Sequence, residues 1–361
     1  MEKQKIAVLV SGGVDSTVAL RLLQEQGHNV TAFYLKIWLE DELAYLGDSC
    51  PWQEDLSFVQ AVCDQAHVPL QILSLQKEYW DYVVTYTIAE IKAGRTPNPD
   101  ILCNKMIKFG FFLDYIDASY QKVATGHYAQ VEQNGEHQFY TLKLAPDALK
   151  DQTYFLSHLS QKQLSRALFP IGHLTKPEVR TLAQKFNVAN KDRKDSQGIC
   201  FLGKLKFHDF IKHYLGEKPG DMIEFESGNL LGTHQGFWFH TIGQRQGSGL
   251  SGGPWYVVAK DVVHNKVYFS RTYYASDKKR TTFTIDQCNW ISGTPPDKET
   301  LKVKIRHGKN MHDCTLTLHA NGTGRVMLAQ DDQGLAAGQF AVFYDGQYCL
   351  GAGVISNDTV A

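Results

Sequence analysis

The sequence predicts an α/β fold: a doubly wound parallel sheet, followed by a β-rich connector and a small C-terminal β-barrel. Residues 1 to about 120 alternate short apolar runs with amphipathic stretches, which is typical of β–α units in a parallel sheet. The apolar run at residues 6–10 leads directly into a glycine turn and a helix-like segment at residues 16–26. From about Gly220 onward, glycines and short alternating runs replace this pattern, as in an all-β domain.

The elements of the first half follow from local patterns. Strands are expected at residues 6–10, 30–35, 70–75 and 122–126, because each is a short apolar run. Helices are expected at residues 55–67, where apolar residues recur every three or four positions, and at 78–93, before Gly94. Ligands of such folds bind at the carboxyl ends of the strands. The glycine turn, Leu35 and Gly126 all follow or end predicted strands, so we expect them at that edge.

The second half changes character twice. Residues 150–205 are expected to be mainly helical, and Pro177 stands where proline is favoured near a helix start. Residues 206–275 are expected to form a compact β-rich connector. The runs 301–306 and 314–318 alternate as strands do, and an Asp345-Gly346 turn predicts a hairpin between residues 340–344 and 348–355.

Composition narrows the class of protein. The 361 residues carry a net charge of −1 and are 43% hydrophobic, which favours a folded chain without a strong overall field for nucleic acid. A nucleic-acid partner would need local basic runs, such as residues 191–194, 204–206 or 278–280. No run of about 18 apolar residues is present, and the N-terminus enters the first strand directly, so we expect a cytoplasmic protein.

The turn between the first strand and helix has the residues of an anion site. Ser11, Gly12, Gly13, Asp15 and Ser16 lie where glycines let backbone N–H groups approach a phosphate, and a helix N-terminus favours negative charge. The turn lacks the Gly-Lys-Ser/Thr ending of a Walker A loop and the Gly-x-Gly-x-x-Gly of a dinucleotide fold. A nucleotide phosphate is therefore expected there, in a different kind of loop.

Two of the seven cysteines lie in polar loops. No pair has Cys-x-x-Cys spacing, so a zinc site and a disulfide framework are not expected. Cys103 follows the proline-rich stretch 94–102 and precedes Lys105 and Lys108, whose charge could stabilise a thiolate. Cys200 follows a polar, glycine-containing turn. On local residues alone, each cysteine could equally be a structural thiol or a member of a redox pair.

Motifs along the whole chain resemble one family. SGGVDS resembles the PP-loop of ATP pyrophosphatases, and the complete set resembles the bacterial tRNA-specific 2-thiouridylases. The two motifs that contain Cys103 and Cys200 are the most specific to this family. The motifs are SGGVDS at 11–16, AGRTPNPDILCNKMIKFG at 93–110, ATGHYA at 124–129, KDQTYFL at 150–156, KDSQGICFLG at 194–203, HTIGQRQG at 240–247 and PWYVVAKD at 254–261.

The resemblance implies an activity, cofactors and partners. A PP-loop ATP-binding catalytic domain would span residues 1–205, a β-rich connector 206–275 and a C-terminal β-barrel 276–361. The enzyme would use ATP with Mg²⁺, the ion bound by Asp15 or water, to adenylate the wobble uridine of tRNA at the carbon-2 oxygen. A persulfide on Cys200, loaded by a sulfur donor such as a cysteine desulfurase or relay protein, would supply sulfur and leave 2-thiouridine, AMP and pyrophosphate.

The resemblance also assigns residues to roles. Cys103 would be the nucleophile, Cys200 the persulfide carrier and Asp100 the acid or base. Either the persulfide attacks carbon 2 directly, giving a Cys103–Cys200 disulfide, or Cys103 first releases hydrosulfide. ATP would contact Leu9, Val10, Ser11, Gly12, Gly13, Val14, Asp15, Ser16, Leu35 and Gly126. The flipped base would contact Asn98, Pro99 and Asp100, and tRNA would contact His127, Lys150, Asp151, Gln152, Arg306, His307 and Gln339.

Two departures and two alternatives accompany this interpretation. His307 stands where the family often has Tyr, and the stretch after Gly247 is shorter than in many relatives. Another AMP-forming ATP pyrophosphatase would share the turn at residues 11–16 but would not need Cys103 and Cys200. A non-catalytic tRNA-binding module would not need the phosphate loop. The donor protein, the tRNAs used and the oligomeric state do not follow from the sequence.

Overall fold

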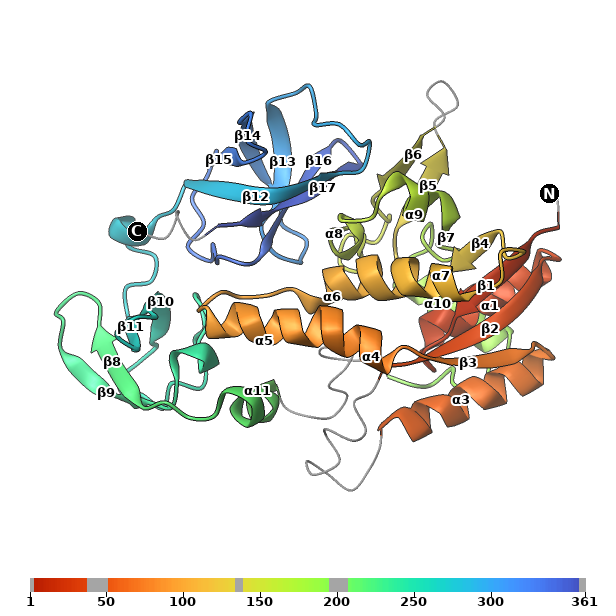
Figure 1. Ribbon diagram of the computed structural model, residues 1–361, viewed down its shortest axis with the longest axis horizontal. Coiled ribbons are helices and arrows are strands. Elements are labelled where there is room, and N and C mark those ends of the chain that lie inside the picture. The colour runs from red at the N-terminus through yellow and green to blue at the C-terminus, as the bar shows by residue number, and fades with distance from the viewer. Residues whose placement is uncertain (1–2, 38–50, 134–138, 195–206, 357–361) are drawn as a thin grey trace.

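The computed structural model describes residues 3–37, 51–133, 139–194 and 207–356 (Figure 1). A parallel five-stranded sheet forms the first part, in the order β3-β2-β1-β4-β7. Its strands are β1 (Lys5–Leu9), β2 (Asn29–Lys36), β3 (Leu70–Ser74), β4 (Lys122–Ala124) and β7 (Ala167–Leu168). The first four agree with the sequence prediction, whereas β7 is a short edge strand within a region expected to be helical.

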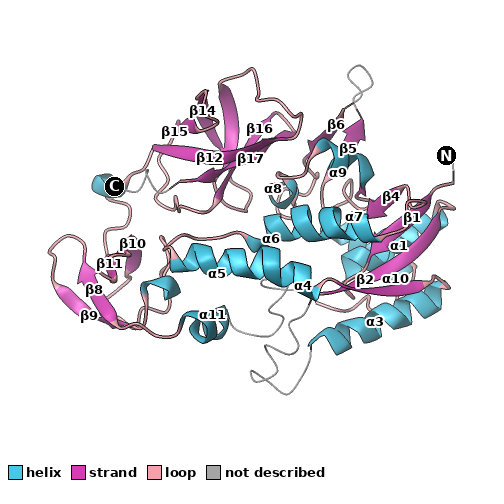
Figure 2. Cartoon of the chain, in the orientation of Figure 1, coloured by secondary structure: helices cyan, strands magenta, loops and turns pink. Residues whose placement is uncertain are grey.

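Helices cover both faces of this sheet, as a doubly wound fold requires (Figure 2). One face packs against α1 (Val14–Glu25) and α3 (Pro51–Ala66). The other face packs against a long helical layer in two arms, each interrupted by a π-helical segment. The first arm is α4 (Gln76–Tyr79), η2 (Trp80–Val84) and α5 (Thr85–Lys92); the second is α6 (Pro99–Leu102), η3 (Cys103–Phe111) and α7 (Phe112–Tyr115).

Among the described residues, three further helices belong to this part of the fold. They are α8 (Thr153–Leu156), α9 (Gln161–Arg166) and α10 (Lys176–Lys185). The α10 helix packs on α1 around Val18, Val179 and Ala183, and it starts with a capping box between Thr175 and Glu178. Pro177 lies in its first turn, as the sequence predicted.

The connector starts with a helix that the sequence did not predict. The α11 helix (Phe207–Leu215) precedes a four-stranded sheet with the order β10-β11-β8-β9. Its strands are β8 (Gly220–Glu224), β9 (Leu230–His234), β10 (Tyr256–Asp261) and β11 (Lys266–Ser270), and short 3₁₀ turns lie at Phe237–Phe239 and Ser276–Lys278. The strands make the region β-rich, as expected, around a small core that includes Val257 and Phe269.

The C-terminal strands close into an antiparallel barrel, because β12 pairs with both β15 and β17. The strands are β12 (Thr282–Trp290), β13 (Thr300–Lys304), β14 (His312–Leu318), β15 (Gly324–Leu328), β16 (Phe340–Asp345) and β17 (Tyr348–Ile355). The predicted hairpin at the Asp345-Gly346 turn is β16–β17.

One hairpin joins the barrel to the first part of the chain. The hairpin of β5 (Gln130–Gln133) and β6 (Tyr140–Lys143) leaves the parallel sheet and pairs with β17, through Lys143 with Tyr348 and Leu142 with Cys349. The barrel sheet therefore extends to eight strands and combines residues 130–143 with the C-terminal strands. In the described residues, no helix is long and apolar enough to cross a membrane.

Candidate functional site

The glycine turn lies between β1 and α1, beside the end of β4. Gly12 has a φ of +77°, which favours glycine, and Gly13 is the residue before α1. Within the described residues, no side chain caps the first turn of α1. Ser16 instead turns inward, and its hydroxyl donates to the Gly13 carbonyl at 3.0 Å. The first-turn N–H groups are thus left to an external acceptor, which suits a phosphate.

Gly126 brings the neighbouring strand end against this turn. A Cβ atom on Gly126 would lie 2.6 Å from the Ser16 nitrogen, closer than side chains ever approach. The two strands β1 and β4 are neighbours in the sheet, and the chain continues outward from them in opposite directions. Such a switch point is where doubly wound folds bind nucleotides. Leu35, near the end of β2, lies at the same edge and is partly buried.

Two cations that the sequence analysis did not assign lie on the turn. Lys176 Nζ contacts both carboxylate oxygens of Asp15, at 2.7 and 2.9 Å, and the Tyr128 hydroxyl donates to the same carboxylate at 3.0 Å. Arg193 donates to the Gly12 carbonyl at 2.9 Å and forms an ion pair with Asp55. Arg193 belongs to the basic run 191–194, which was considered only as a nucleic-acid contact.

The second group of predicted residues surrounds the start of α6. Asn98 is the residue before this helix, and its side-chain oxygen accepts from the Ile101 N–H at 3.4 Å. Asp100 is partly exposed, whereas Cys103 is buried and begins the π-helical segment η3. Segments of this rare kind are frequent at functional sites. Burial lowers the pKa of Lys105, two residues further on.

The barrel fixes the proline-rich stretch before Asn98. The Gln339 side chain donates to the carbonyls of Thr96 at 3.0 Å and Pro97 at 3.2 Å. The Thr96 N–H donates to the Ala337 carbonyl at 2.8 Å. Gln339 was predicted to contact tRNA. In the structure its amide braces the stretch that leads to the proposed base site.

Arg306 and His307 follow the end of β13, and they lie near the residues of α6. Arg306 forms a two-pronged ion pair with Asp332, at 3.0 and 2.7 Å, and its side chain remains half exposed. His307 is an exposed residue whose ring is partly covered, because it stacks on Phe155 with centroids 4.5 Å apart. The Asp100 carboxylate is near enough to favour the charged form of His307, although burial dominates and lowers the His307 pKa. The barrel residues and the α6 residues therefore share one region.

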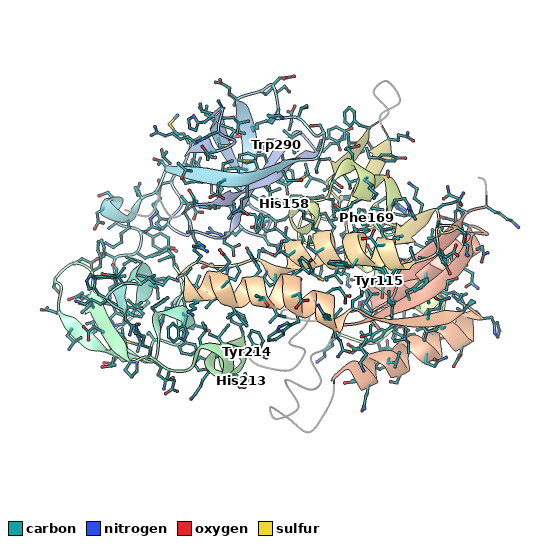
Figure 3. The ribbon with its side chains drawn as sticks, viewed as in Figure 1. Tyr115, His158, Phe169, His213, Tyr214 and Trp290 are labelled. Atoms are coloured by element: carbon teal, nitrogen blue, oxygen red, sulfur yellow. The ribbon has the colours of Figure 1, made fainter. Side chains whose placement is uncertain are left out.

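Other predicted tRNA contacts are less accessible. His127 is buried, its Nδ1 atom lies 2.7 Å from the Thr125 hydroxyl, and desolvation lowers its pKa well below the usual value. Asp151 is also buried and pairs with Lys304. Gln152 accepts from the Tyr128 N–H at 3.0 Å, and Lys150 is partly exposed. His158, which is not among the predicted contacts and is labelled in Figure 3, is buried against Phe340 of the barrel.

The predicted redox pair is only half described. Cys103 lies within the described residues, whereas Cys200 and the motif at residues 195–203 lie outside them. Three further cysteines, Cys288, Cys314 and Cys349, belong to strands of the barrel, and burial raises their thiol pKa values to about 11, 12 and 12. A thiol with so high a pKa is a poor nucleophile at neutral pH. In the described part of the chain, no group of three or more His, Cys, Asp or Glu residues could hold a metal ion.

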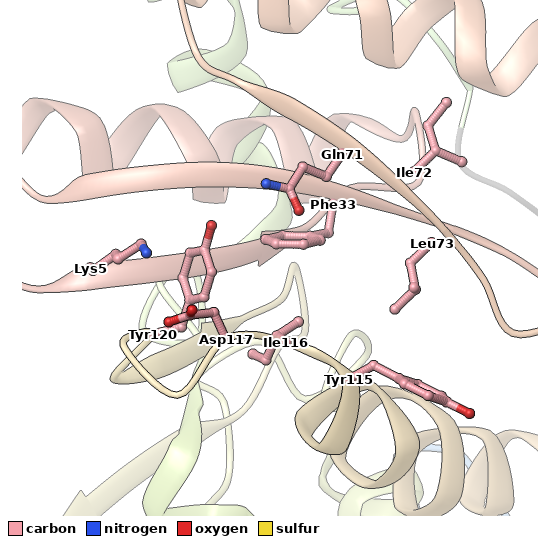
Figure 4. Close-up of a pocket in the computed structure, with 9 residues that line it drawn as sticks. All are labelled: Lys5, Phe33, Gln71, Ile72, Leu73, Tyr115, Ile116, Asp117 and Tyr120. Carbon is pink, nitrogen blue, oxygen red and sulfur yellow. The ribbon is translucent and has the colours of Figure 1, made fainter.

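A pocket on the sheet lies away from both groups (Figure 4). The lining residues come from three strands and from the end of α7 with the loop after it: Lys5 on β1, Phe33 on β2, Gln71, Ile72 and Leu73 on β3, and Tyr115, Ile116, Asp117 and Tyr120. Lys5 lies 4.3 Å from the ring centre of Tyr120. The pocket contains none of the predicted site residues.

Comparisons with known proteins cover nearly the whole chain. Residues 4–204 match the family described as "tRNA methyl transferase HUP domain", residues 208–271 the "tRNA methyl transferase PRC-barrel domain", and residues 280–355 the "Aminomethyltransferase beta-barrel domain". The tRNA-specific 2-thiouridylase MnmA 2 of Bacteroides fragilis (strain YCH46) is 44% identical over 356 residues, which are 97% of this chain and 99% of that protein.

A second relative agrees with the first. The tRNA-specific 2-thiouridylase MnmA of Parabacteroides distasonis is 42% identical over 361 residues, covering 98% of this chain and 99% of that protein. Among solved structures, the U34-tRNA thiolase NcsA from Methanococcus maripaludis is similar with a TM-score of 0.36 and 16% identity, over 59% of this chain and 68% of that one.

Proposed function

This chain belongs to the tRNA-specific 2-thiouridylase family, and on that premise we propose that it transfers sulfur to carbon 2 of the wobble uridine of tRNA. The products are 2-thiouridine, AMP and pyrophosphate, and the reaction takes place in the cytoplasm. We further propose that residues 1–205 form the catalytic domain, residues 206–275 the connector and residues 276–361 the barrel. The observation that carries the proposal is the convergence of Asn98, Asp100, Cys103 and the barrel residue Gln339 in one region.

In the first step the turn at residues 11–16 binds ATP. The first-turn N–H groups of α1 and the close approach of Gly126 fit a pyrophosphate, and Leu9, Val10 and Leu35 place the turn at the sheet edge. The uridine O2 atom attacks the α-phosphorus, the bond to the β-phosphate oxygen breaks and pyrophosphate leaves. The N3 proton leaves the base as O2 bonds to phosphorus, and Asp100, the proposed acid or base of the step, is its final acceptor.

Magnesium would bind together with ATP. Both oxygens of Asp15 already contact Lys176, so this carboxylate is largely neutralised. Mg²⁺ is commonly held by substrate phosphates and water with one or two carboxylates. We therefore propose that the phosphates of ATP would hold the ion, with Asp15 acting through water, and that the ion would neutralise charge on the leaving pyrophosphate.

Sulfur transfer is the second step. The terminal sulfur of a persulfide on Cys200 attacks carbon 2, and the carbon–oxygen bond to AMP breaks. The Cys103 thiolate then attacks the Cys200 sulfur, which leaves a Cys103–Cys200 disulfide and the 2-thio group on the base. In the alternative order, Cys103 attacks first and releases hydrosulfide, which then attacks carbon 2. A persulfide donor protein reloads Cys200 once an external thiol has reduced the disulfide.

The base has to leave its stack to reach this site. Asn98, Pro99 and Asp100 are the proposed contacts of the flipped base. Arg306 and His307 are exposed and suit direct contact with tRNA, together with Lys150 and Gln152. We assign His127, Asp151 and Gln339 to the same surface as supporting residues, because they are partly or fully buried.

One experiment tests the function. Purified protein is incubated with unmodified tRNA, ATP, Mg²⁺ and a persulfide source, and the tRNA is digested and analysed by mass spectrometry. We expect 2-thiouridine at the wobble position, and AMP and pyrophosphate in equal amounts. Omission of ATP is the control. ATP turnover without sulfur in the tRNA would favour a different ATP pyrophosphatase, and tRNA binding without ATP turnover would favour a binding module.

A further inference from the structure

A buried ion pair joins the barrel to the catalytic domain. Lys304, the last residue of β13, lies 2.9 Å from Asp151, and their side chains are 2% and 1% exposed. Asp151 also accepts hydrogen bonds from the Thr153 hydroxyl at 2.9 and 3.1 Å and from the Ala145 N–H at 3.2 Å. The carboxylate and the ammonium are thus fully enclosed, and removal of one charge leaves the other buried without a partner.

The backbone carbonyl of Asp151 contacts the ring of His307, a residue of the proposed tRNA surface. The Asp151 carbonyl lies 3.3 Å from His307 Nε2. A carbonyl oxygen can only accept a hydrogen bond, so Nε2 carries the proton. In the neutral ring, Nδ1 is then an acceptor. Burial lowers the His307 pKa, which favours the neutral ring at neutral pH, although Lys304, Asp151 and Asp100 all act on it.

The segment that follows Asp151 holds the same ring from a second side. Phe155 stacks on His307 with an interplanar angle of 30°, and Tyr154 meets it edge-on with centroids 6.2 Å apart. Both aromatic residues belong to α8, which begins at Thr153, the residue hydrogen-bonded to the Asp151 carboxylate. The position and the polarity of His307 therefore both depend on where the Asp151 segment lies.

We propose that Lys304 is a positioning residue that, through Asp151, fixes His307 as a neutral ring with an acceptor at Nδ1, and that this acceptor favours uracil in the bound tRNA. Uracil offers an N–H group at N3, whereas cytosine has a lone pair there. An acceptor on the protein suits the first base and opposes the second. The inference rests on the proposed tRNA substrate and extends it to a reason for base choice.

A purely structural role for the ion pair predicts a different outcome. Loss of Lys304 would then lower stability and weaken all RNA binding equally, without a change in the ratio between two bases. The positioning role instead predicts a change in the His307 tautomer and in that ratio. Lys302 supplies a matched control, because it lies on the same strand and forms an ion pair with Asp313 at the surface.

The test compares Lys304→Met with Lys302→Met in the full chain. Nitrogen-15 NMR, with the His307 signal assigned by its loss in His307→Gln, reports the tautomer. Binding to two anticodon stem-loop RNAs that differ only by U or C at the wobble position gives the ratio. We expect the wild type and Lys302→Met to show the Nε2–H tautomer and a preference for U. Lys304→Met should lose the Nε2–H tautomer and the preference for U. The ratio of its affinities for the U and C RNAs should fall about fivefold, while its ATP affinity stays unchanged.

Each remaining outcome decides the matter. A wild-type ratio near one, or a Lys304→Met protein that keeps its tautomer and ratio, would overturn the inference. If Lys304→Met does not fold, Asp151→Asn/Lys304→Met removes both buried charges, and the same losses are expected from it; retention of the ratio there would equally overturn the inference. Failure of the wild type to thiolate tRNA while the NMR signal and the U preference hold would remove the proposed function and leave the positioning role standing.

Discussion

The turn at residues 11–16 and the region around Asn98, Asp100 and Cys103, here called the base region, are built in different ways. The turn consists of consecutive residues between β1 and α1, and its shape follows from two glycines and a helix start. The base region unites α6, the segment after β6, the end of β13 and Gln339. Gln339 reaches Thr96 across 243 positions of sequence. A site made of one local segment can be recognised from its residues, whereas a site braced by side chains from another domain depends on the complete fold.

The largest expected effect is a loss of sulfur transfer at the base region, with ATP binding at the turn unchanged. Cys103→Ala should abolish tRNA thiolation, because no other thiol takes its place beside Asn98 and Asp100 in the proposed mechanism. ATP affinity should stay at the wild-type value, since the turn at residues 11–16 is unaltered. Cys200→Ala should behave alike. Sulfur incorporation is measured by mass spectrometry and ATP affinity by calorimetry.

Cys314→Ala is the matched control for both cysteine variants. Its thiol is buried in the barrel with a pKa raised to about 12, so we expect normal thiolation. If this control lost activity while Cys103→Ala retained it, the assignment of the nucleophile would be wrong.

The second effect is weaker ATP binding at the turn, with the base region unchanged. Gly126→Ala places a Cβ atom 2.6 Å from the Ser16 nitrogen, so the end of β4 must move away from α1. Crowding of this kind costs about 2 kcal/mol, which corresponds to about thirtyfold weaker ATP binding. Gly232→Ala is the control, because its Cβ atom meets nothing within 4 Å. Equal ATP affinity in the two variants would argue against a nucleotide at this turn.

The third effect weakens the brace between the domains. Gln339→Ala removes two hydrogen bonds to the stretch before Asn98 and should cost about 1–2 kcal/mol of unfolding free energy. Thiolation should fall about tenfold, if the brace sets the position of Asp100. ATP affinity should not change. An unaltered rate constant at saturating tRNA would show that the brace serves stability alone.

The last effect leaves activity at neutral pH unchanged and concerns only the acid sensitivity of the fold near the base region. Burial lowers the pKa of His158 from 6.5 to about 3, so between these values the unfolded chain binds a proton that the folded chain does not. The unfolding free energy should therefore fall as the pH decreases from 6.5, by about 1.4 kcal/mol per pH unit for this group. His158→Phe should flatten the curve by that slope in urea titrations between pH 6 and 4. Parallel curves for the two proteins would contradict the prediction.

Local signals predicted most of the fold and only part of the site. The strands β1 to β4 and the barrel hairpin were predicted because each is a short apolar or alternating run. The α11 helix and the short strand β7 were missed, since short elements are decided by their neighbours rather than by their own pattern. Alternation in residues 301–306 placed Lys304 on the same side as exposed Lys302. Lys304 is buried instead, because the segment that carries Asp151 packs against the barrel at that point.

The two cations beside the turn at residues 11–16 were not predicted, for a similar reason. Lys176 lies at the start of α10 and Arg193 in a basic run, and neither carries a motif that points to the turn. The helix packing of α10 on α1 brings Lys176 to Asp15, and only the folded chain shows this. The pairing of Cys103 with Cys200 stays a prediction, because Cys200 lies outside the described residues.

The strand β6 has a consequence for attempts to divide this protein into pieces. Because β6 pairs with β17, a fragment that stops before the barrel would keep the β5–β6 hairpin with an open edge, and the separated barrel would expose the matching edge of β17. Unpaired edges of this kind recruit other chains and promote aggregation. Expression of either half alone should therefore yield insoluble material, and a soluble catalytic fragment would require removal of the hairpin at the same time.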